Sequence, residues 1–247
     1  MWKRPWVTVG FSASSLPDRA VDKPAAAPDD ALVDAGGPIL IFGAGGPLTT
    51  DLEESCARLG RHVAAAVLNR PGPGFSVEPA RLLPVADLGP ELRRLPFLCP
   101  LFTPANRKVA VAEALKLGLQ PATALIDPTA ILAASATVAV GSFVNAGCVI
   151  GALARLGRHV LVNRAASLAH HAEIGDFASI GPGAVLTGQV RIGAGVLVGA
   201  GAIVEPGLTL GDGSVLAAGA VLRRDLPAGA LAAGNPARIL RAARRAV

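Results

Sequence analysis

The sequence predicts a small α/β unit followed by a long parallel β-helix, and three observations support this fold class. Short apolar segments alternate with helix-like segments from residue 38 to about residue 122. From residue 126 to residue 222, an apolar residue recurs at every sixth position without a slip. The chain is 51% hydrophobic but holds only seven Phe, two Trp and no Tyr, and a core of small and aliphatic side chains suits a narrow, tightly wound fold.

Residues 1–37 are expected to form a mostly irregular N-terminal arm. Prolines interrupt any periodicity in this segment, and Gly36-Gly37 ends it. The segment resembles a signal peptide only faintly, because Pro5 and Gly10 break up its short apolar stretch.

The cysteines indicate a reducing compartment. Cys56, Cys99 and Cys148 are widely spaced and odd in number, which favours free thiols over a disulfide framework. No apolar run in the chain reaches the roughly 18 residues that a membrane span requires. We therefore expect a cytoplasmic protein without a membrane partner.

Residues 38–122 show the alternation that is typical of a small parallel α/β domain. The expected strands are short apolar runs at Ile39–Phe42, His62–Leu68 and Leu95–Phe102. The expected helices are Thr49–Gly60, Asp87–Arg94 and Ala105–Leu117, the last of which stops at Gly118. Thr49, Thr50 or Asp51 is expected to cap the first helix, and Pro71–Gly74 is expected to form a turn.

A strict period of six begins at Ile126 and ends at Leu222. Its seventeen apolar residues, called anchors below, are Ile126, Leu132, Val138, Val144, Ile150, Leu156, Val162, Leu168, Ile174, Ile180, Leu186, Ile192, Val198, Val204, Leu210, Leu216 and Leu222. Gly follows seven of these anchors, and the fourth residue after an anchor is usually Ala, Ser or Cys.

Neither an α-helix, with about 3.6 residues per turn, nor an alternating strand, with a period of about two, explains this pattern. A short strand followed by a turn does explain it, and three such units make a triangular coil of eighteen residues. Each anchor then points into the prism above the anchor one coil earlier, and coils stack at about 4.8 Å. The small fourth residues let the chain pass the narrow interior. We expect the Gly after an anchor to permit a turn that a side chain would obstruct.

The repeat, with Gly-Asn-Pro-Ala-Arg-Ile-Leu at residues 234–240, resembles the hexapeptide-repeat acyltransferases. With the α/β unit in front, residues 38–241 resemble the sugar O- and N-acetyltransferases that acetylate sialic acid or nucleotide-linked amino sugars. The supporting motifs are Ile41–Gly46, Asn106-Arg107 at a helix start, Asn163 and Ala169–Phe177.

The resemblance implies the domain organisation and the partners. Residues 38–122 would form a small Rossmann-like acceptor-binding domain. Residues 123–247 would form a left-handed β-helix acetyltransferase domain with a C-terminal tail. Acetyl-CoA would be the co-substrate, and the protein would be a homotrimer.

His170 is the candidate catalytic base. It follows the anchor Leu168 by two residues, so its side chain should lie near a corner of the coil rather than inside the prism. An imidazole, with an unperturbed pKa of about 6.5, suits removal of a proton from an amine or hydroxyl at neutral pH, and the resemblance implies the same role. Gly188, one coil later at the same corner, is expected to donate its N–H to the oxyanion of the thioester and to contact the cofactor. The alternatives are a surface histidine without a task and an ordinary corner glycine.

The resemblance also implies residues that bind the acceptor. Asn163 matches an asparagine near the acceptor, and Gly43, Gly45 and Gly46 form the glycine loop of the acceptor-binding domain. The alternatives are a turn asparagine and a tight strand-to-helix turn. His171 is also counted as an acceptor-site residue, although the family usually has Glu or Asp there to orient the catalytic histidine.

The glycine-loop region departs from the family in two further places. Pro47-Leu48 stands where relatives often have His-Gly, and Asn69-Arg70 stands where they often have an acidic residue. The nucleotide of the acceptor therefore need not be uridine diphosphate.

The net charge of +5 has its densest basic stretch near the C-terminus. The arginines there are Arg223, Arg224, Arg238, Arg241, Arg244 and Arg245. We expect Gly234 and Arg238 to contact acetyl-CoA, with arginines attracting its phosphates; a solvated basic tail is the alternative. Nucleic acid is not expected, because no aromatic residue is interleaved with these charges.

Two other functions compete with acetyl transfer. A γ-type carbonic anhydrase on the same coil would need three histidines around zinc, with a pair about five apart. His159, His170 and His171 lack that spacing, so no metal is expected. The second competitor is a non-catalytic binding or assembly protein. The sequence favours direct acetyl transfer to an amine or hydroxyl of a sugar that is linked to a nucleotide, without deciding between N- and O-acetylation.

Overall fold

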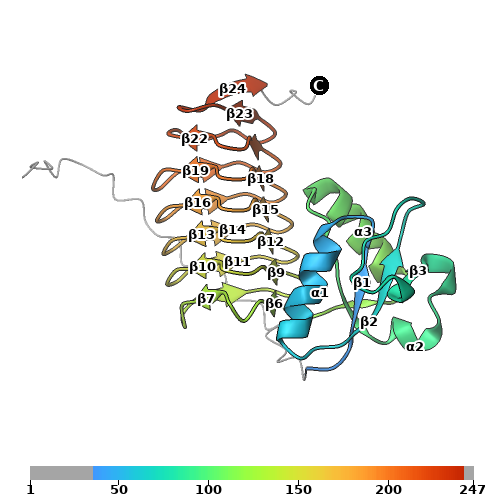
Figure 1. Cartoon of the computed structure of the whole chain (residues 1–247). Coiled ribbons are helices and arrows are strands. Elements are labelled where there is room, and N and C mark those ends of the chain that lie inside the picture. The colour runs from blue at the N-terminus through green and yellow to red at the C-terminus, as the bar shows by residue number, and fades with distance from the viewer. Residues whose placement is uncertain (1–35, 242–247) are drawn as a thin grey trace, which may run out of the picture.

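The computed structural model describes residues 36–241 of the 247-residue chain. The arm expected at 1–37 thus lies outside the described residues except for Gly36 and Gly37, as do Arg244 and Arg245. An α/β unit stands beside the first coils of a tall β-helix, with helix α1 next to the coils (Figure 1). Within residues 36–241, no helix is both long and apolar enough to cross a lipid bilayer.

The α/β unit is built on a parallel five-stranded sheet. In spatial order its strands are β3 (Leu82–Pro84), β2 (Val63–Leu68), β1 (Ile39–Phe42), β4 (Pro96–Leu98) and β5 (Gln120–Pro121). The helices are α1 (Leu48–Arg58), α2 (Pro90–Arg93) and α3 (Pro104–Lys116), with 3-10 turns at Pro79–Arg81 and Val85–Asp87.

The sheet is apolar on both faces, as the near-continuous hydrophobic run of β1 requires. Ile39 and Ile41 pack on one face against Leu52 of α1, and the same cluster includes Phe143 and Leu161 from the β-helix. The alternate residues of β1 pack on the other face against α3. The sheet therefore sits between α1 and α3, and the coils contact both helices.

Several predicted boundaries in this unit need correction. The predicted cap of α1 is wrong: Pro47 precedes the helix, and the hydroxyls of Thr49 and Thr50 donate to carbonyls of the preceding turn. The predicted helix over 87–94 is broken, because Pro90 can begin a helix but cannot continue one. Strands β3 and β5 were not predicted, since both are very short and end in proline.

The β-helix contains seventeen two-residue strands, and each ends at an anchor. They are β6 (Leu125–Ile126), β7 (Ile131–Leu132), β8 (Thr137–Val138), β9 (Phe143–Val144), β10 (Val149–Ile150), β11 (Arg155–Leu156), β12 (Leu161–Val162), β13 (Ser167–Leu168), β14 (Glu173–Ile174), β15 (Ser179–Ile180), β16 (Val185–Leu186), β17 (Arg191–Ile192), β18 (Leu197–Val198), β19 (Ile203–Val204), β20 (Thr209–Leu210), β21 (Val215–Leu216) and β22 (Val221–Leu222). Two closing strands follow, β23 (Leu231–Ala233) and antiparallel β24 (Arg238–Arg241).

Every third strand belongs to the same sheet, which gives the three faces of the prism. The six-stranded sheet runs from β7 to β22, the five-stranded sheet from β8 to β20, and the eight-stranded sheet from β6 to β24. Register is constant at one coil, as in Val149↔Ser167 and Ile150↔Leu168. All seventeen anchors lie in or against the interior core, which confirms the predicted period-six fold.

The glycines after the anchors confirm the prediction that a side chain would be obstructed there, and the obstruction comes from the next coil. Gly151, Gly175 and Gly181 do not have a left-handed φ; a Cβ on any of them would lie 2.6–2.7 Å from backbone atoms of the next coil. Glycine is needed there because adjacent coils approach closely. The left-handed conformation occurs instead at the third residue after an anchor, where His159 (φ 54°) and His171 (φ 58°) adopt it without being glycine.

Arg107 of α3 holds the α/β unit to the β-helix. Its side chain is buried, and its guanidinium donates to the carbonyls of His159 (2.9 Å), Phe177 (2.7 Å) and Ala178 (2.9 Å) in two successive coils. Burial lowers the pKa of Arg107 to about 10, which still leaves it charged at neutral pH. In the described part of the chain no carboxylate forms an ion pair with it, so backbone carbonyls and the hydroxyl of Ser179 (2.9 Å) stabilise the cation.

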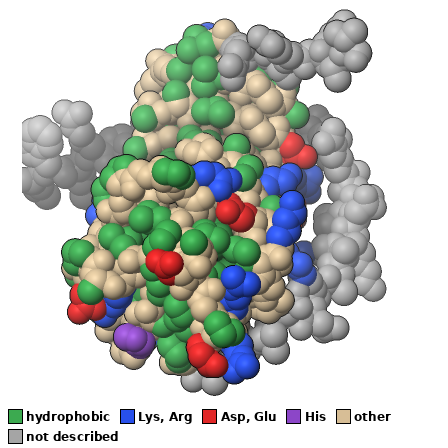
Figure 2. Space-filling model, turned by 90° about the vertical axis from the view of Figure 1, so that its right-hand side faces the viewer, with side chains coloured by type: hydrophobic (Ala, Val, Ile, Leu, Met, Phe, Trp, Pro, Cys, Tyr) green, Lys and Arg blue, Asp and Glu red, His purple; other side chains and the backbone are tan. Residues whose placement is uncertain are grey.

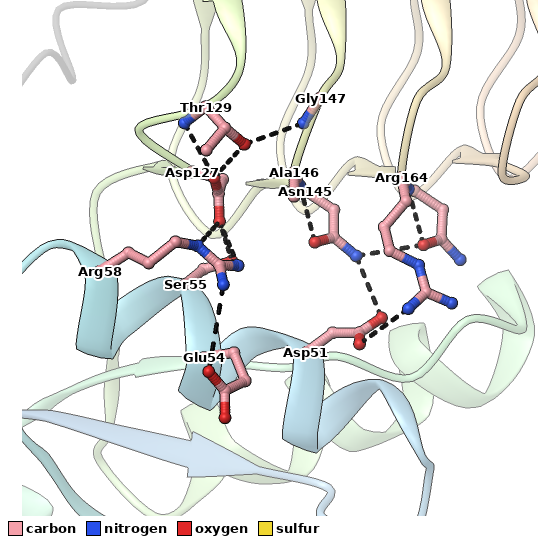
Figure 3. A network of polar contacts seen from close by, with 11 residues as sticks. Asp51, Glu54, Ser55, Arg58, Asp127, Thr129, Asn145, Ala146, Gly147 and Arg164 are labelled. Atoms are coloured by element: carbon pink, nitrogen blue, oxygen red, sulfur yellow. Dashed lines mark hydrogen bonds and ion pairs between the residues drawn. The ribbon is translucent and has the colours of Figure 1, made fainter.

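A second set of polar contacts joins α1 to the first coils (Figure 3). Asp127 is fully buried and accepts from Ser55 (2.6 Å) and from the Nη2 of Arg58 (2.6 Å). Desolvation alone would raise the pKa of Asp127, but hydrogen bonds from Ser55, Thr129 and Arg58 outweigh it and hold the pKa well below its usual range. Asp127 is therefore a charged clamp between the two units.

Arg107→Met should lower the free energy of unfolding by about 3 kcal/mol, because several buried carbonyls lose their donor together. Lys108→Met, at an exposed position on the same helix, is the matched control and should change stability little. Urea unfolding of the three proteins tests this. Equal midpoints for both variants would contradict the role given to Arg107. If Arg107→Met does not fold, Arg107→Lys should still show a measurable loss, since one ammonium cannot reach all the carbonyls.

Candidate active site at a corner of the coil

His170 lies in the turn between β13 and β14, at the corner between the six-stranded and five-stranded sheets. The preceding anchor, Leu168, is buried, and the carbonyl of His170 accepts from the N–H of Gln189 at 3.0 Å. The backbone is therefore fixed on both sides while the imidazole is exposed. This is the outward position that the offset from the anchor predicts.

Gly188 lies directly against the ring of His170. A Cβ on Gly188 would lie 2.7 Å from Cε1 and 2.8 Å from Nε2 of His170, so the imidazole occupies the space of a side chain at position 188. Within residues 36–241, no acceptor takes the backbone N–H of Gly188. The corner thus combines a ring nitrogen with a nearby amide that is free to donate.

His171 is in contact with His170. The two Nδ1 atoms are 3.0 Å apart, and the rings are nearly perpendicular, at 87°. Glu173, which is close in sequence, instead pairs with Arg191 at 3.5 Å. The sequence did not predict the contact between the histidines, because it depends on side-chain rotamers and on the left-handed backbone of His171.

Asn163 lies at a different corner, in the turn between β12 and β13. Its Oδ1 accepts from the Nδ2 of Asn145 (3.1 Å) and from the N–H of Arg164 (2.8 Å). Asn145 and Arg164 in turn reach Asp51 of α1, at 3.2 and 3.3 Å (Figure 3). Within one chain, the structure therefore places Asn163 at the contact with α1 and does not bring it to His170.

Gly43, Gly45 and Gly46 form the turn between β1 and α1. Gly43 has a φ of 91°, and a Cβ on it would lie 3.1 Å from the side chain of Leu101, so this position needs glycine for its conformation and for its packing. The strand order changes direction at β1, between β2 and β4. In parallel α/β sheets, ligands bind beyond the carboxyl ends of the strands at such a switch point.

The end of β2 lies near the same edge. Asn69 and Arg70 both reach Glu113 of α3, with an Nδ2–Oε2 distance of 3.1 Å and an Nη1–Oε2 distance of 2.8 Å. A carboxylate is thus present at this edge, but it comes from α3, and sequence reasoning missed it. Basic and acidic side chains are interspersed over the face of the molecule that carries the α/β unit (Figure 2).

Gly234 and Arg238 lie at the other end of the β-helix. Gly234 accepts from the N–H of Val221 in β22 at 3.0 Å, so this turn covers the last strand of the six-stranded sheet. Gly188 follows β16 of the same sheet. Strands β16 and β22 are two strand spacings apart, or about 10 Å. Arg238 is exposed, and its Nη1 contacts only nearby carbonyls, the nearer being Ala237 at 3.2 Å.

The buried cysteines and His159 are part of the packing. Burial raises the pKa of Cys148 to about 11, and its thiol donates to the carbonyl of Asn163 at 3.1 Å, so Cys148 is a core residue, as the sequence predicts. His159 is buried between Phe97 and Phe177, with ring centroids 6.4 and 5.0 Å away, at another corner from His170. Among the described residues, no three His, Cys, Asp or Glu side chains form a group that could hold a metal ion.

Solved structures of similar fold include enzymes of known activity. GDP-perosamine N-acetyltransferase from Caulobacter crescentus, solved as a variant with CoA and GDP-perosamine, is 29% identical, with a TM-score of 0.75 over 85% of this chain and 99% of that chain. The acetyltransferase domain of PglB from Neisseria gonorrhoeae, solved with acetyl coenzyme A, is 32% identical, with a TM-score of 0.71 over 83% of this chain and 98% of that domain. WeeI from Acinetobacter baumannii shares the fold at 22% identity, with a TM-score of 0.74 over 83% of this chain and all of that chain.

The family model described as the hexapeptide repeat of succinyl-transferase matches residues 189–224. No curated protein sequence matches significantly. The period-six coil, the α/β unit in front of it and 32% identity over nearly the whole PglB domain agree with one another. The chain belongs to the hexapeptide-repeat acetyltransferases and is related to those that act on nucleotide sugars.

Proposed function

We propose that the protein transfers the acetyl group of acetyl-CoA to an amine or hydroxyl of a nucleotide-linked sugar. The observation that carries the proposal is the imidazole of His170 held against Gly188 at an exposed corner. The proposal places the acetyl group between this base and the free backbone N–H of Gly188. The relatives solved with CoA and GDP-perosamine, or with acetyl coenzyme A, support these substrate classes, and the N-acetyltransferase activity of the GDP-perosamine enzyme favours an amine.

The proposed reaction is direct and needs no acyl-enzyme. The acceptor amine attacks the thioester carbonyl carbon while Nε2 of His170 takes the proton that the amine loses. The carbonyl oxygen becomes an oxyanion, to which the N–H of Gly188 donates. The tetrahedral intermediate expels the CoA thiolate, which takes the proton from His170. The products are an amide and CoA with a free thiol, so atoms and charge balance.

In this proposal the acceptor's diphosphate binds at the glycine loop of Gly43, Gly45 and Gly46. The loop lies before the first turn of α1, where unpaired N–H groups and the helix dipole favour an anion. Its place at the switch point of the sheet fits a nucleotide. Asn69, Arg70 and Glu113 border the same edge and would select the nucleotide.

The proposal includes a homotrimer. The six-stranded sheet presents an apolar outer face: Ile131, Val149, Val185 and Ile203 are 66%, 42%, 37% and 38% exposed. The five-stranded sheet instead presents Thr and charged side chains, and the α/β unit covers Phe143 and Leu161 of the third sheet.

The corners that carry Asn163 and His170 flank the apolar face on either side. Three copies that meet along it, about an axis parallel to the coils, would bring Asn163 of one subunit toward His170 of its neighbour. Asn163 and His171 would then belong to the acceptor site at the subunit boundary.

Light scattering at micromolar concentration should give about three times the 24.8 kDa mass of one chain. Val149→Glu combined with Ile203→Glu should shift the mass toward the monomer, because charge on the apolar face opposes its burial. Thr137→Glu on the five-stranded sheet is the matched control and should leave the trimer intact. A wild-type mass near that of a single chain would contradict the assembly.

Acetyl-CoA should run along the end of the six-stranded sheet, from Gly188 toward Gly234 and Arg238. Arg238→Ala should raise the dissociation constant of CoA about fivefold, as expected for one exposed charge-assisted contact, and should weaken its salt dependence. Arg94→Ala, in a surface pair with Glu91 of the α/β unit, is the control. Calorimetric titration at low and high salt checks this. Unchanged affinity of Arg238→Ala at both would remove the residue from the site.

His170→Ala should lower kcat by about 10²–10⁴-fold and leave CoA affinity nearly unchanged, because the base contacts the proton that is transferred rather than the cofactor. His62→Ala, at an exposed position of the α/β unit, is the control. The assay measures CoA thiol release with a panel of nucleotide-linked amino sugars, and mass spectrometry identifies the product. Wild-type kcat for His170→Ala would refute the assignment of the base. A non-catalytic binding protein would release no thiol with any acceptor.

A further inference from the structure

The contact between His170 and His171 has a chemical requirement. Two ring nitrogens that are 3.0 Å apart attract each other only when one carries a proton and the other offers a lone pair. Within residues 36–241, neither imidazole pairs with a carboxylate, and the neighbouring Glu173 is held by Arg191. His171 is therefore the side chain that can fix the tautomer and the orientation of His170.

Only one placement of the shared proton is compatible with base catalysis at Nε2. If Nδ1 of His170 carries the proton, its Nε2 has a free lone pair on the edge that faces Gly188. If Nδ1 of His171 carries it, Nε2 of neutral His170 must be protonated and cannot accept another proton. When His170 takes a proton during the reaction, both of its ring nitrogens carry hydrogen. An Nδ1–H on His171 would then face the Nδ1–H of His170, and the hydrogen bond would be lost. If Nδ1 of His171 is instead the acceptor, the hydrogen bond persists throughout the reaction.

We propose that His171 is a positioning residue whose Nδ1 accepts from the Nδ1–H of His170 and keeps Nε2 of His170 free as the base. This inference rests on the proposed function. It gives a neutral imidazole the orienting task that a carboxylate performs in other histidine-dependent sites.

The fold itself supplies tolerated replacements for His171. Leu153 and Gln189 occupy the same corner position one coil earlier and one coil later, with φ of 60° and 63° against 58° for His171. His171→Leu therefore removes the acceptor at a position where the fold accepts Leu. His171→Asn restores an acceptor, because Oδ1 of Asn is as many bonds from Cα as Nδ1 of His, and Asn adopts the left-handed region readily.

The test compares steady-state kinetics of these variants with a confirmed acceptor. His171→Leu should lower kcat about 10–100-fold, as loss of an orienting partner typically does, with the KM for acetyl-CoA within about twofold of wild type. His171→Asn should recover most of the loss. In the His170→Ala background, His171→Leu should cost nothing further, because His171 acts through His170. Wild-type kcat in His171→Leu, or an equal loss in His171→Asn, would overturn the inference.

These outcomes separate the inference from the proposed function. If His170→Ala is impaired and His171→Leu is not, only the positioning role fails; if His170→Ala keeps wild-type kcat, the base assignment fails. NMR of protein labelled with heavy nitrogen in histidine gives a readout that needs no acceptor. His170 should carry its proton on Nδ1, and His171→Leu should shift the proton toward Nε2. A proton on Nε2 of His170 in the wild-type protein would overturn the inference.

Discussion

The constant register of the coil is the constraint on which the rest of the structure depends. From β6 to β22 each strand has two residues and pairs with the strand one coil away, so strand partners there are fixed at a spacing of eighteen. This spacing stacks the anchors into one core, and it sets the ring of His170 on Gly188. The same spacing sets the ring of His159 against Gly141, one coil earlier, although burial between Phe97 and Phe177 makes that histidine a packing residue.

The attachment of the α/β unit adds a second constraint. Arg107 binds carbonyls from two coils, and Asp127 is held from α1, so both ends of the contact are polar and buried. A buried cation without a carboxylate is stable only where several dipoles point at it, and successive corners of the coil supply these dipoles. The half of the molecule that carries the glycine loop is thereby fixed relative to the half that carries His170.

Sequence reasoning predicted the coil because one apolar residue in six is a signal that local preferences do not obscure. The same register predicted that His170 and Gly188 share a corner. Apolar periodicity does not predict the left-handed residues at the third position after an anchor; the glycines that recur there, such as Gly195, Gly201 and Gly207, are the signal for them. The role of Arg107, the contact between His170 and His171, and the distance of Asn163 from His170 depend on side-chain packing and on which corner each turn forms. Strands as short as β3 and β5 carry too few residues for any pattern.

The central proposal is that the acetyl group is transferred at the corner shared by His170 and Gly188. A crystal structure of the full-length protein with acetyl-CoA tests it most directly. The proposal predicts that the thioester carbonyl oxygen lies about 2.7–3.1 Å from the backbone nitrogen of Gly188, with the carbonyl carbon open to an acceptor beside Nε2 of His170. An acetyl group bound at another corner of the coil, or a Gly188 N–H that points away from it, would contradict the account.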